Sequence, residues 1–267
     1  MIKVHISFWL AAVIFWAVGL GWDFLMVATA VTAHELAHIL TARVFGCKLQ
    51  QLKISALGEM ALIPYMDRLP PFKRTVTITA GPGCNLLIGV LAGCFGFELF
   101  GLYNLVLCGF NMMPIFPLDG ARLFQLWAGN CIGVMRANRW TLWAGKICCI
   151  ALMLLGTVQA ILYAPNITML IAGFALWRRN RSLQLELTGE FYMAMLKKPA
   201  RLAKKALSIR AICAYSHQSL APIVDSMGWD NILTVTMPDQ DNVVITELDI
   251  LNHVLKHGLN GILSDVK

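Results

Sequence analysis

Charged residues are scarce in this chain of 267 residues, because Asp, Glu, Lys and Arg together make up only 14% of it. Ordinary soluble domains contain about 25%. Apolar residues make up 58%, and the mean hydropathy is +0.65. The shortage of charge argues against a single soluble domain, and the apolar excess excludes a disordered chain. The composition therefore predicts a protein that faces a lipid bilayer.

A C-x-x-C spacing is also absent, although the chain has eight cysteines. A free thiol in an apolar stretch behaves as a small apolar side chain. Five of the cysteines stand in such stretches, namely Cys84, Cys94, Cys108, Cys148 and Cys149. We assign no function to the cysteines.

The few charges are unevenly distributed along the chain. The first 177 residues carry 17 of them and the last 90 carry 20. The change falls after Trp177, where two arginines follow and where we expect the chain to leave the membrane. We therefore predict a transmembrane domain at 1–181, a helical linker at 182–205 and a small cytosolic domain at 206–267.

Apolar runs in the first part predict an α-helical polytopic membrane protein with about six transmembrane helices. The runs lie near 6–22, 24–45, 76–97, 99–116, 141–163 and 166–177. Lys and Arg are concentrated in alternate loops, which predicts that both termini are cytoplasmic. The net charge of +7 reflects these flanking residues, so we expect no nucleic-acid partner.

The second apolar run contains the motif H-E-x-x-H, formed by His34, Glu35 and His38. Residues four apart share one face of a helix, so the two imidazoles can bind the same metal ion. The glutamate between them is a candidate general base for a metal-activated water. The alternative is a helix end with solvated polar residues. An apolar setting makes buried ionisable groups costly, and this favours a functional site.

A third ligand has to come from elsewhere, because Thr41 and Val44 stand where an extended H-E-x-x-H motif would have a glycine and a histidine. Asp119 follows a proline-containing segment at the end of another apolar run. It can complete a His-His-carboxylate set. An ordinary helix cap is the other reading of the same aspartate.

The motif H-E-L-A-H, followed by N-x-x-P-x-x-P-L-D-G from Asn111 to Gly120, resembles the site-2 protease family of intramembrane zinc metalloproteases. The resemblance implies that three residues bind one zinc ion and that Glu35 is the general base. The implied zinc ligands are His34, His38 and Asp119.

The same resemblance implies a substrate-binding region. Asn111 and Pro114 match family positions near the substrate, and Ala80-Gly81-Pro82-Gly83 resembles the family's A-G-P element. Gly58 belongs to a segment that resembles the family's glycine-containing substrate edge. We expect an edge strand near 54–64 to hold an unwound substrate by adding it as a further strand.

The last part of the chain predicts a small α/β domain. Strands are expected at Ile232–Thr236 and Val243–Ile245, and a helix from Leu248. The run V-V-I-T-E-L-D-I resembles half of a cystathionine-beta-synthase (CBS) module. This resemblance implies ATP or another adenine nucleotide as a ligand, held by Thr246 and Asp249. A purely structural or dimerising module is the alternative.

A single C-terminal CBS-like module and the pattern P-I-x-P-L-D-G resemble the sporulation branch of the family. That resemblance implies a membrane-associated substrate, a precursor sigma factor of the pro-sigma-K type, and inhibitory membrane proteins. The expected location is the bacterial cell membrane or the outer forespore membrane facing the mother cell. Homo-oligomers, other membrane-bound regulators as substrates (an anti-sigma factor or a signal-peptide remnant) and a metal-binding transporter remain alternatives.

Overall fold

The computed structural model describes residues 2–4, 6–47, 51–55, 58–62, 69–162, 168–202, 208–229 and 231–266. The chain forms two compact units. The first comprises Met1–Met113 and Leu118–Leu123, and the second comprises Pro114–Pro117 and Phe124–Lys267.

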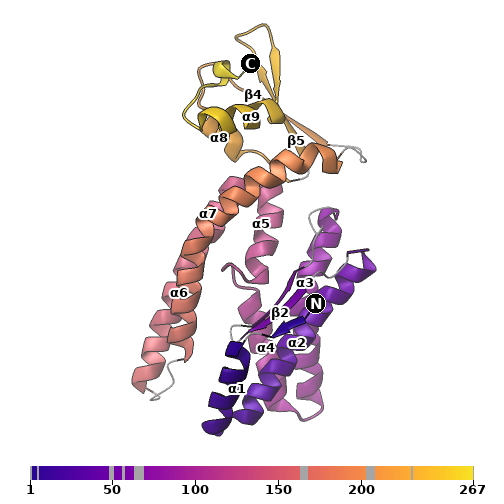
Figure 1. Ribbon diagram of the computed structural model, residues 1–267, viewed down its shortest axis with the longest axis vertical. Helices are drawn as coiled ribbons and strands as arrows, with labels where there is room; N and C mark the ends of the chain where they lie inside the picture. The colour runs from indigo at the N-terminus through magenta and orange to yellow at the C-terminus, as the bar shows by residue number, and fades with distance from the viewer. Residues whose placement is uncertain are drawn as a thin grey trace. The chain divides into compact units, whose positions relative to one another are not determined.

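Helices make up most of the first unit (Figure 1). Its helices are α1 (Ile6–Ala17), α2 (Gly21–Val44), α3 (Pro71–Cys94) and α4 (Glu98–Asn111), followed by the first turn of α5 (Asp119–Ile132). Helix α3 packs against both α2 and α4. Pro71 occupies the first turn of α3, where its missing N–H costs no intrahelical hydrogen bond. This packing places α3 beside the H-E-x-x-H helix.

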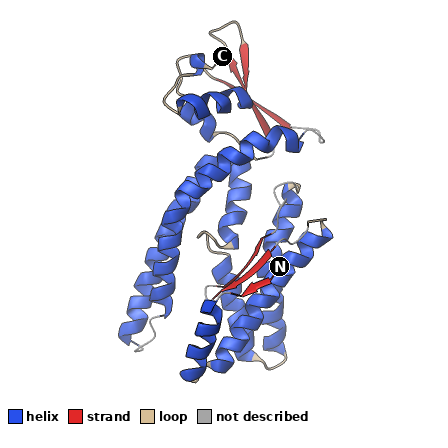
Figure 2. Ribbon diagram, in the orientation of Figure 1, coloured by secondary structure: helices blue, strands red, loops and turns tan. Residues whose placement is uncertain are grey.

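A small sheet lies next to these helices (Figure 2). Strand β1 (Ile2–Val4) pairs in parallel with β2 (Gln51–Ser55), and β2 pairs antiparallel with β3 (Gly58–Leu62). The order is β1-β2-β3, so within the described part of the chain β3 is an edge strand. It also contacts α2. The strand expected near 54–64 is therefore present at Gly58–Leu62, and residues 56, 57, 63 and 64 lie outside the described residues.

Three of the helices are long and apolar enough to cross a membrane. They are α2, α3 and α6 (Val134–Leu162), and they correspond to the spans predicted at 24–45, 76–97 and 141–163. Helices α1 and α4 have 12 and 14 residues, shorter than the about 20 that cross a bilayer core. The expectation of six spans is therefore not confirmed.

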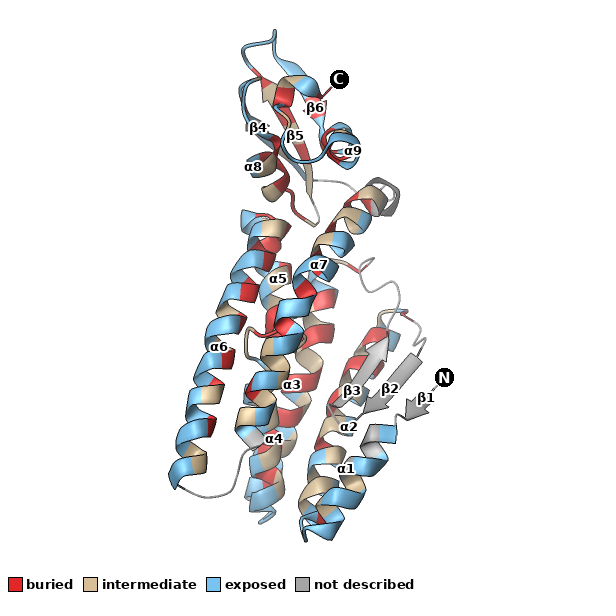
Figure 3. Ribbon diagram, turned by 60° about the vertical axis from the view of Figure 1, so that its left-hand side comes forward, coloured by how far each residue is buried: buried red, intermediate tan, exposed pale blue. Residues whose placement is uncertain are grey.

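Helices α6 and α7 (Thr168–Leu202) lie side by side in the second unit (Figure 1). Both helices have exposed residues, drawn pale blue in Figure 3, and many of these residues are large and apolar. On α6 these side chains include Ile147, Ile150, Leu154, Leu155, Ile161 and Leu162. Such exposure is what a lipid-facing surface requires. The structure and the composition thus agree on an integral membrane protein.

The predicted sixth span and the predicted linker form one helix, because α7 continues past the arginines at 178–181. On the part of α7 that follows the arginines, four apolar side chains are buried, namely Leu183, Leu187, Phe191 and Met195. Phe191 and Met195 belong to the same core as the C-terminal strands and helices. The domain boundaries at 181 and 205 stay a prediction.

The C-terminal module combines a three-stranded sheet with two short helices. Strand β4 (Ser208–Cys213) is parallel to β5 (Asn231–Met237), which is antiparallel to β6 (Val243–Thr246). Helices α8 (Leu220–Asp225) and α9 (Glu247–His257) and a 3-10 turn (Leu263–Asp265) complete it. The strands and helix predicted from 232 to 256 are confirmed, whereas a CBS module is not shown.

Candidate metal centre

Helix α2 presents His34 and His38 on one face, as the four-residue spacing predicts. Both residues are buried, with 4% and 8% of their surface exposed. Their Nε2 atoms lie 3.1 Å apart, and the rings meet edge to face. Two imidazole nitrogens therefore point at the same small volume.

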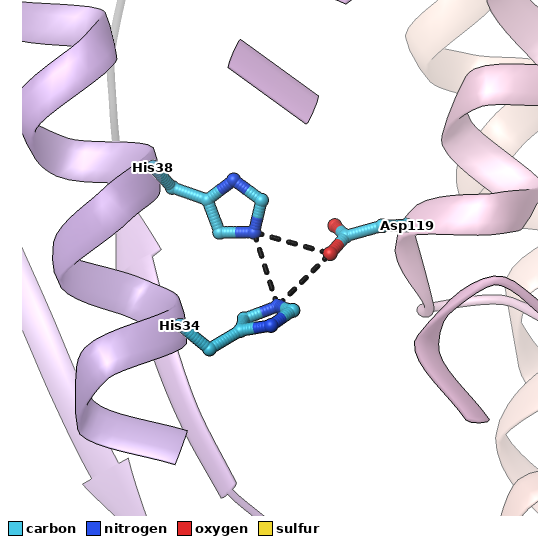
Figure 4. Close-up of side chains that lie close together, drawn as sticks. All are labelled: His34, His38 and Asp119. Carbon is cyan, nitrogen blue, oxygen red and sulfur yellow. Dashed lines mark hydrogen bonds and ion pairs between the residues drawn. The ribbon is translucent and has the colours of Figure 1, made fainter. Parts of the chain in front are cut away.

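Asp119 completes this cluster from the start of α5 (Figure 4). Its Oδ2 lies 3.0 Å from Nε2 of His34 and 3.1 Å from Nε2 of His38. Gly120 permits this placement, because a Cβ there would collide with the Met112 carbonyl and lie 2.6 Å from the Met113 oxygen. The structure brings together the three residues predicted as zinc ligands.

The three ligand atoms fit a tetrahedral cation. Two atoms that each lie about 2.0 Å from such an ion are about 3.3 Å apart. The observed separations are 3.0 to 3.1 Å. Two imidazole nitrogens and a carboxylate oxygen converge here, and hydrogen bonds from two neutral imidazoles cannot fill all three edges of the triangle. A bound cation would satisfy all three at once, and nitrogen and carboxylate ligands suit zinc.

Helix α3 leaves space for such an ion. A Cβ on Gly81 would collide with Nε2 of His38 and would lie 2.7 Å from Nε2 of His34. Only a residue without a side chain therefore allows α3 to pass this close to the ligand atoms. This steric requirement explains the glycine of the Ala80-Gly81-Pro82-Gly83 element.

Two further residues of α3 contact the far sides of the imidazoles. Nδ1 of His38 donates to the Thr77 carbonyl oxygen at 2.7 Å. The Asn85 side-chain amide lies 3.2 Å from Nδ1 of His34. Thr77 and Asn85 are both fully buried. Sequence reasoning missed these two, although a polar residue inside an apolar span is the signal that singled out the histidines.

Glu35 lies on α2 between the two histidines and is half-buried. Electrostatic interactions connect its carboxylate with His34, His38 and Asp119. The carboxylate therefore belongs to the electrostatic surroundings of the cluster. Its position agrees with the role of general base that the motif predicts.

The predicted substrate residues are placed less directly. Asn111 is the last residue of α4 and donates through Nδ2 to the Leu107 carbonyl at 3.0 Å. Gly58 opens β3 opposite Ser55 of β2. Pro114 belongs to the short segment grouped with the second unit. The substrate-binding roles of all three stay predictions.

Thr246 and Asp249 have a local structural role in the C-terminal module. The Thr246 side chain accepts from the Asp249 backbone N–H, and the Asp249 carboxylate accepts from the Thr246 N–H at 3.2 Å. These reciprocal bonds form a capping box at the start of α9. Nucleotide binding at these residues stays a prediction.

Two comparisons with known proteins agree with this centre. The chain is 28% identical over 181 residues to zinc metalloprotease MJ0392 of Methanocaldococcus jannaschii, covering 59% of this chain and 51% of the relative. It is 26% identical over 160 residues to stage IV sporulation protein FB of Bacillus subtilis, covering 57% of this chain and 56% of the relative. The chain therefore spans about half the length of the curated relatives it matches. No protein-family profile matches it.

The fold has a solved counterpart. The site-2 protease from Methanocaldococcus jannaschii matches with a TM-score of 0.55 and 23% identity, over 68% of this chain and 90% of that one. The observations first define a class, that of helical membrane proteins with a buried His-His-Asp metal centre. Within that class, the fold is similar to that of the solved site-2 protease, and the sequence is similar to that of a zinc metalloprotease.

Proposed function

We propose that this chain is an intramembrane zinc metalloprotease that hydrolyses a peptide bond of a membrane-associated protein. The observation that carries the proposal is the convergence of His34, His38 and Asp119 within 3.1 Å, beside Glu35 and within a bundle of apolar helices. The zinc metalloprotease relative supports the same reaction class.

The residues divide the chemistry among them. Zinc, when bound, lowers the pKa of water and polarises the scissile carbonyl. His34, His38 and Asp119 would hold the ion. Glu35 would accept a proton from the attacking water and return it to the departing amine.

A substrate helix has its carbonyls engaged in internal hydrogen bonds and must unwind before it can react. We propose that β3, with Gly58 at its start, binds the extended substrate along its edge. Its position at the end of the β1-β2-β3 order and its contact with α2 support this role. Asn111 and Pro114 are proposed to contact the substrate.

The finer assignment concerns biology. We propose that the substrate is a precursor sigma factor of the pro-sigma-K type and that the protein acts during sporulation. The similarity to the sporulation protein of Bacillus subtilis supports this branch. Control by inhibitory membrane proteins and a topology with both termini in the cytoplasm belong to the same proposal. A reporter fused after Trp177 that proved extracytoplasmic would contradict that topology.

The decisive experiment compares wild type with Glu35→Gln in cleavage of a single-pass membrane substrate by the purified, zinc-loaded chain. We expect cleavage to fall at least about 100-fold, because the general base is lost while the ligands remain. Glu98→Gln, at an exposed glutamate at the start of α4, is the matched control and should cleave normally. Equal cleavage by wild type and Glu35→Gln would contradict the proposal. Zinc uptake into vesicles without any cleavage would instead favour a transporter.

A further inference from the structure

Helix α3 turns one face toward the metal centre. Thr77, Gly81 and Asn85 are spaced four residues apart, so they lie in a row on the same side of the helix. All three are buried. The middle residue leaves room beside the Nε2 atoms, and the outer two meet the Nδ1 atoms of the histidines. One helix face thus contacts both sides of each imidazole.

A neutral imidazole has one N–H and one lone pair, so the partner of one nitrogen decides what the other can do. At His38 the Thr77 carbonyl can only accept, which places the proton on Nδ1 and the lone pair on Nε2. Nε2 is the atom that points at Asp119. The backbone of α3 therefore prepares His38 as a metal ligand.

At His34 the group that faces Nδ1 is the side chain of Asn85, not a backbone carbonyl. As placed, Nδ2 of Asn85 lies 3.2 Å from Nδ1 of His34. Among the residues that the structure describes, the buried Oδ1 of Asn85 has no hydrogen-bond partner. An N–H donated to Nδ1 would leave the proton of a neutral His34 on Nε2, where it blocks metal binding. A half-turn of the amide exchanges its oxygen and nitrogen and removes that conflict.

We propose that Asn85 is a positioning residue whose Oδ1 accepts a hydrogen bond from Nδ1–H of His34 and so holds the Nε2 lone pair toward the metal ion. The assignment rests on the proposed zinc site. It makes the two histidines equivalent, since each donates from Nδ1 to an oxygen of α3.

The first test measures zinc affinity of the full-length protein in detergent by competition with a chelator, with no substrate present. Loss of an outer hydrogen-bond partner typically weakens metal binding about 10- to 100-fold, and we expect this for Asn85→Leu. Asn85→Asp keeps an acceptor oxygen and should bind zinc nearly as tightly as wild type. Zinc affinity of Asn85→Leu equal to wild type would overturn the proposal, as would equal losses in Asn85→Leu and Asn85→Asp.

Asn104 provides a matched control. It is a fully buried asparagine on α4, and its amide donates to the Phe100 carbonyl of its own helix at 2.9 Å. Its Oδ1 likewise has no partner among the described residues. Asn104→Leu should keep wild-type zinc affinity. A loss equal to that of Asn85→Leu would assign the effect to general destabilisation and overturn the proposal.

A second measurement needs no variant at Asn85. In zinc-free protein carrying nitrogen-15 in its histidines, the imidazole shifts report which nitrogen of His34 carries the proton. A proton on Nδ1 supports the proposal, and an unprotonated Nδ1 overturns it. Cleavage is assayed separately. A protein that binds zinc through this arrangement yet cleaves nothing would contradict the proposed protease function while leaving the role of Asn85 intact.

Discussion

Two buried clusters of charged groups, one in each compact unit, differ in how their donors and acceptors are matched. In the C-terminal module, Nζ of Lys198 donates to Oε1 of Glu247 at 2.7 Å and to the Gly228 carbonyl at 2.7 Å. Oε2 of Glu247 also accepts from the backbone N–H of Leu233 at 2.8 Å. At the metal centre, acceptor atoms face one another instead.

The difference separates a structural ion pair from a binding site. Lys198 and Glu247 are almost fully buried, and each finds opposite charge and hydrogen bonds within the protein. Such a pair needs nothing from outside. His34, His38 and Asp119 leave their lone pairs directed at one point, which a cation can satisfy. Substitutions in the two clusters should therefore affect different properties of the protein.

The largest effect is expected from Gly81→Ala. The added methyl group would occupy the space in front of both Nε2 atoms, so zinc affinity should fall by more than the about 100-fold that marks loss of an outer partner. Chelator competition measures it. Gly83→Ala is the control, because a Cβ there meets nothing within 4 Å. Zinc affinity of Gly81→Ala at the wild-type level would show that the ion does not bind between these side chains.

Lys198→Met should affect stability and leave zinc affinity unchanged. Removing one partner of a buried ion pair leaves the other charge unpaired and costs about 3–5 kcal/mol. Hydrogen exchange at the amides of β5, which include the Leu233 N–H, measures the loss in the full chain. Lys256→Met, at an exposed position in the last turn of α9, should cost under about 1 kcal/mol. If the β5 amides of Lys198→Met exchange as slowly as in the wild type, the Lys198–Glu247 pair does not stabilise the module and the two clusters do not differ in the way described.

A smaller effect is expected from Thr246→Ala, which deletes one half of the capping box. Loss of an N-cap side chain costs about 0.5–2 kcal/mol, and Thr246→Ser should retain most of it. Hydrogen exchange at the backbone amides of α9 measures this loss of stability. Titration of the same proteins with ATP tests the nucleotide prediction independently. If Thr246→Ala abolishes ATP binding and Thr246→Ser preserves it, the capping-box residues also bind the nucleotide.

The smallest effect is expected at Asp239, in the turn before β6. Its side-chain hydrogen bond with Ser216 and the backbone N–H of Ser216 at 2.9 Å lower the pKa of its carboxyl. A lowered folded-state pKa gives stability that is present above the unfolded value of about 3.9 and is lost as pH falls through the folded-state pKa. Asp239→Asn should remove this part of the pH dependence of Tm in acid. An unchanged acid profile would contradict it.

Local patterns in the sequence predicted much of the metal centre. The H-E-x-x-H spacing is sufficient to place two imidazoles on one helix face, because only the helix period is involved. Asp119 was reached through the motif that contains it and by resemblance, since its distance from α2 depends on tertiary packing. The roles of Gly81 and Asn85 were not predictable, because each depends on which face α3 turns toward α2.

The fold shows the same division between local and long-range information. The strand β1 was not predicted, since its partner Leu52 lies far from Ile2 along the chain. The arginines after Trp177 predicted that the chain leaves the membrane and that the sixth apolar helix ends there. The backbone of α7 continues instead. A change in composition marks a change of surroundings and does not require a change of backbone conformation.

The continuity of α7 has a structural consequence. Its 35 residues extend about 52 Å at 1.5 Å per residue, well beyond the about 30 Å of a bilayer core. Near one end, Gly173 packs closely against Met153 of α6, and near the other, Lys198 is fastened to Glu247. One unbroken helix therefore joins an apolar segment packed against α6 to a segment that belongs to the core of the α/β module.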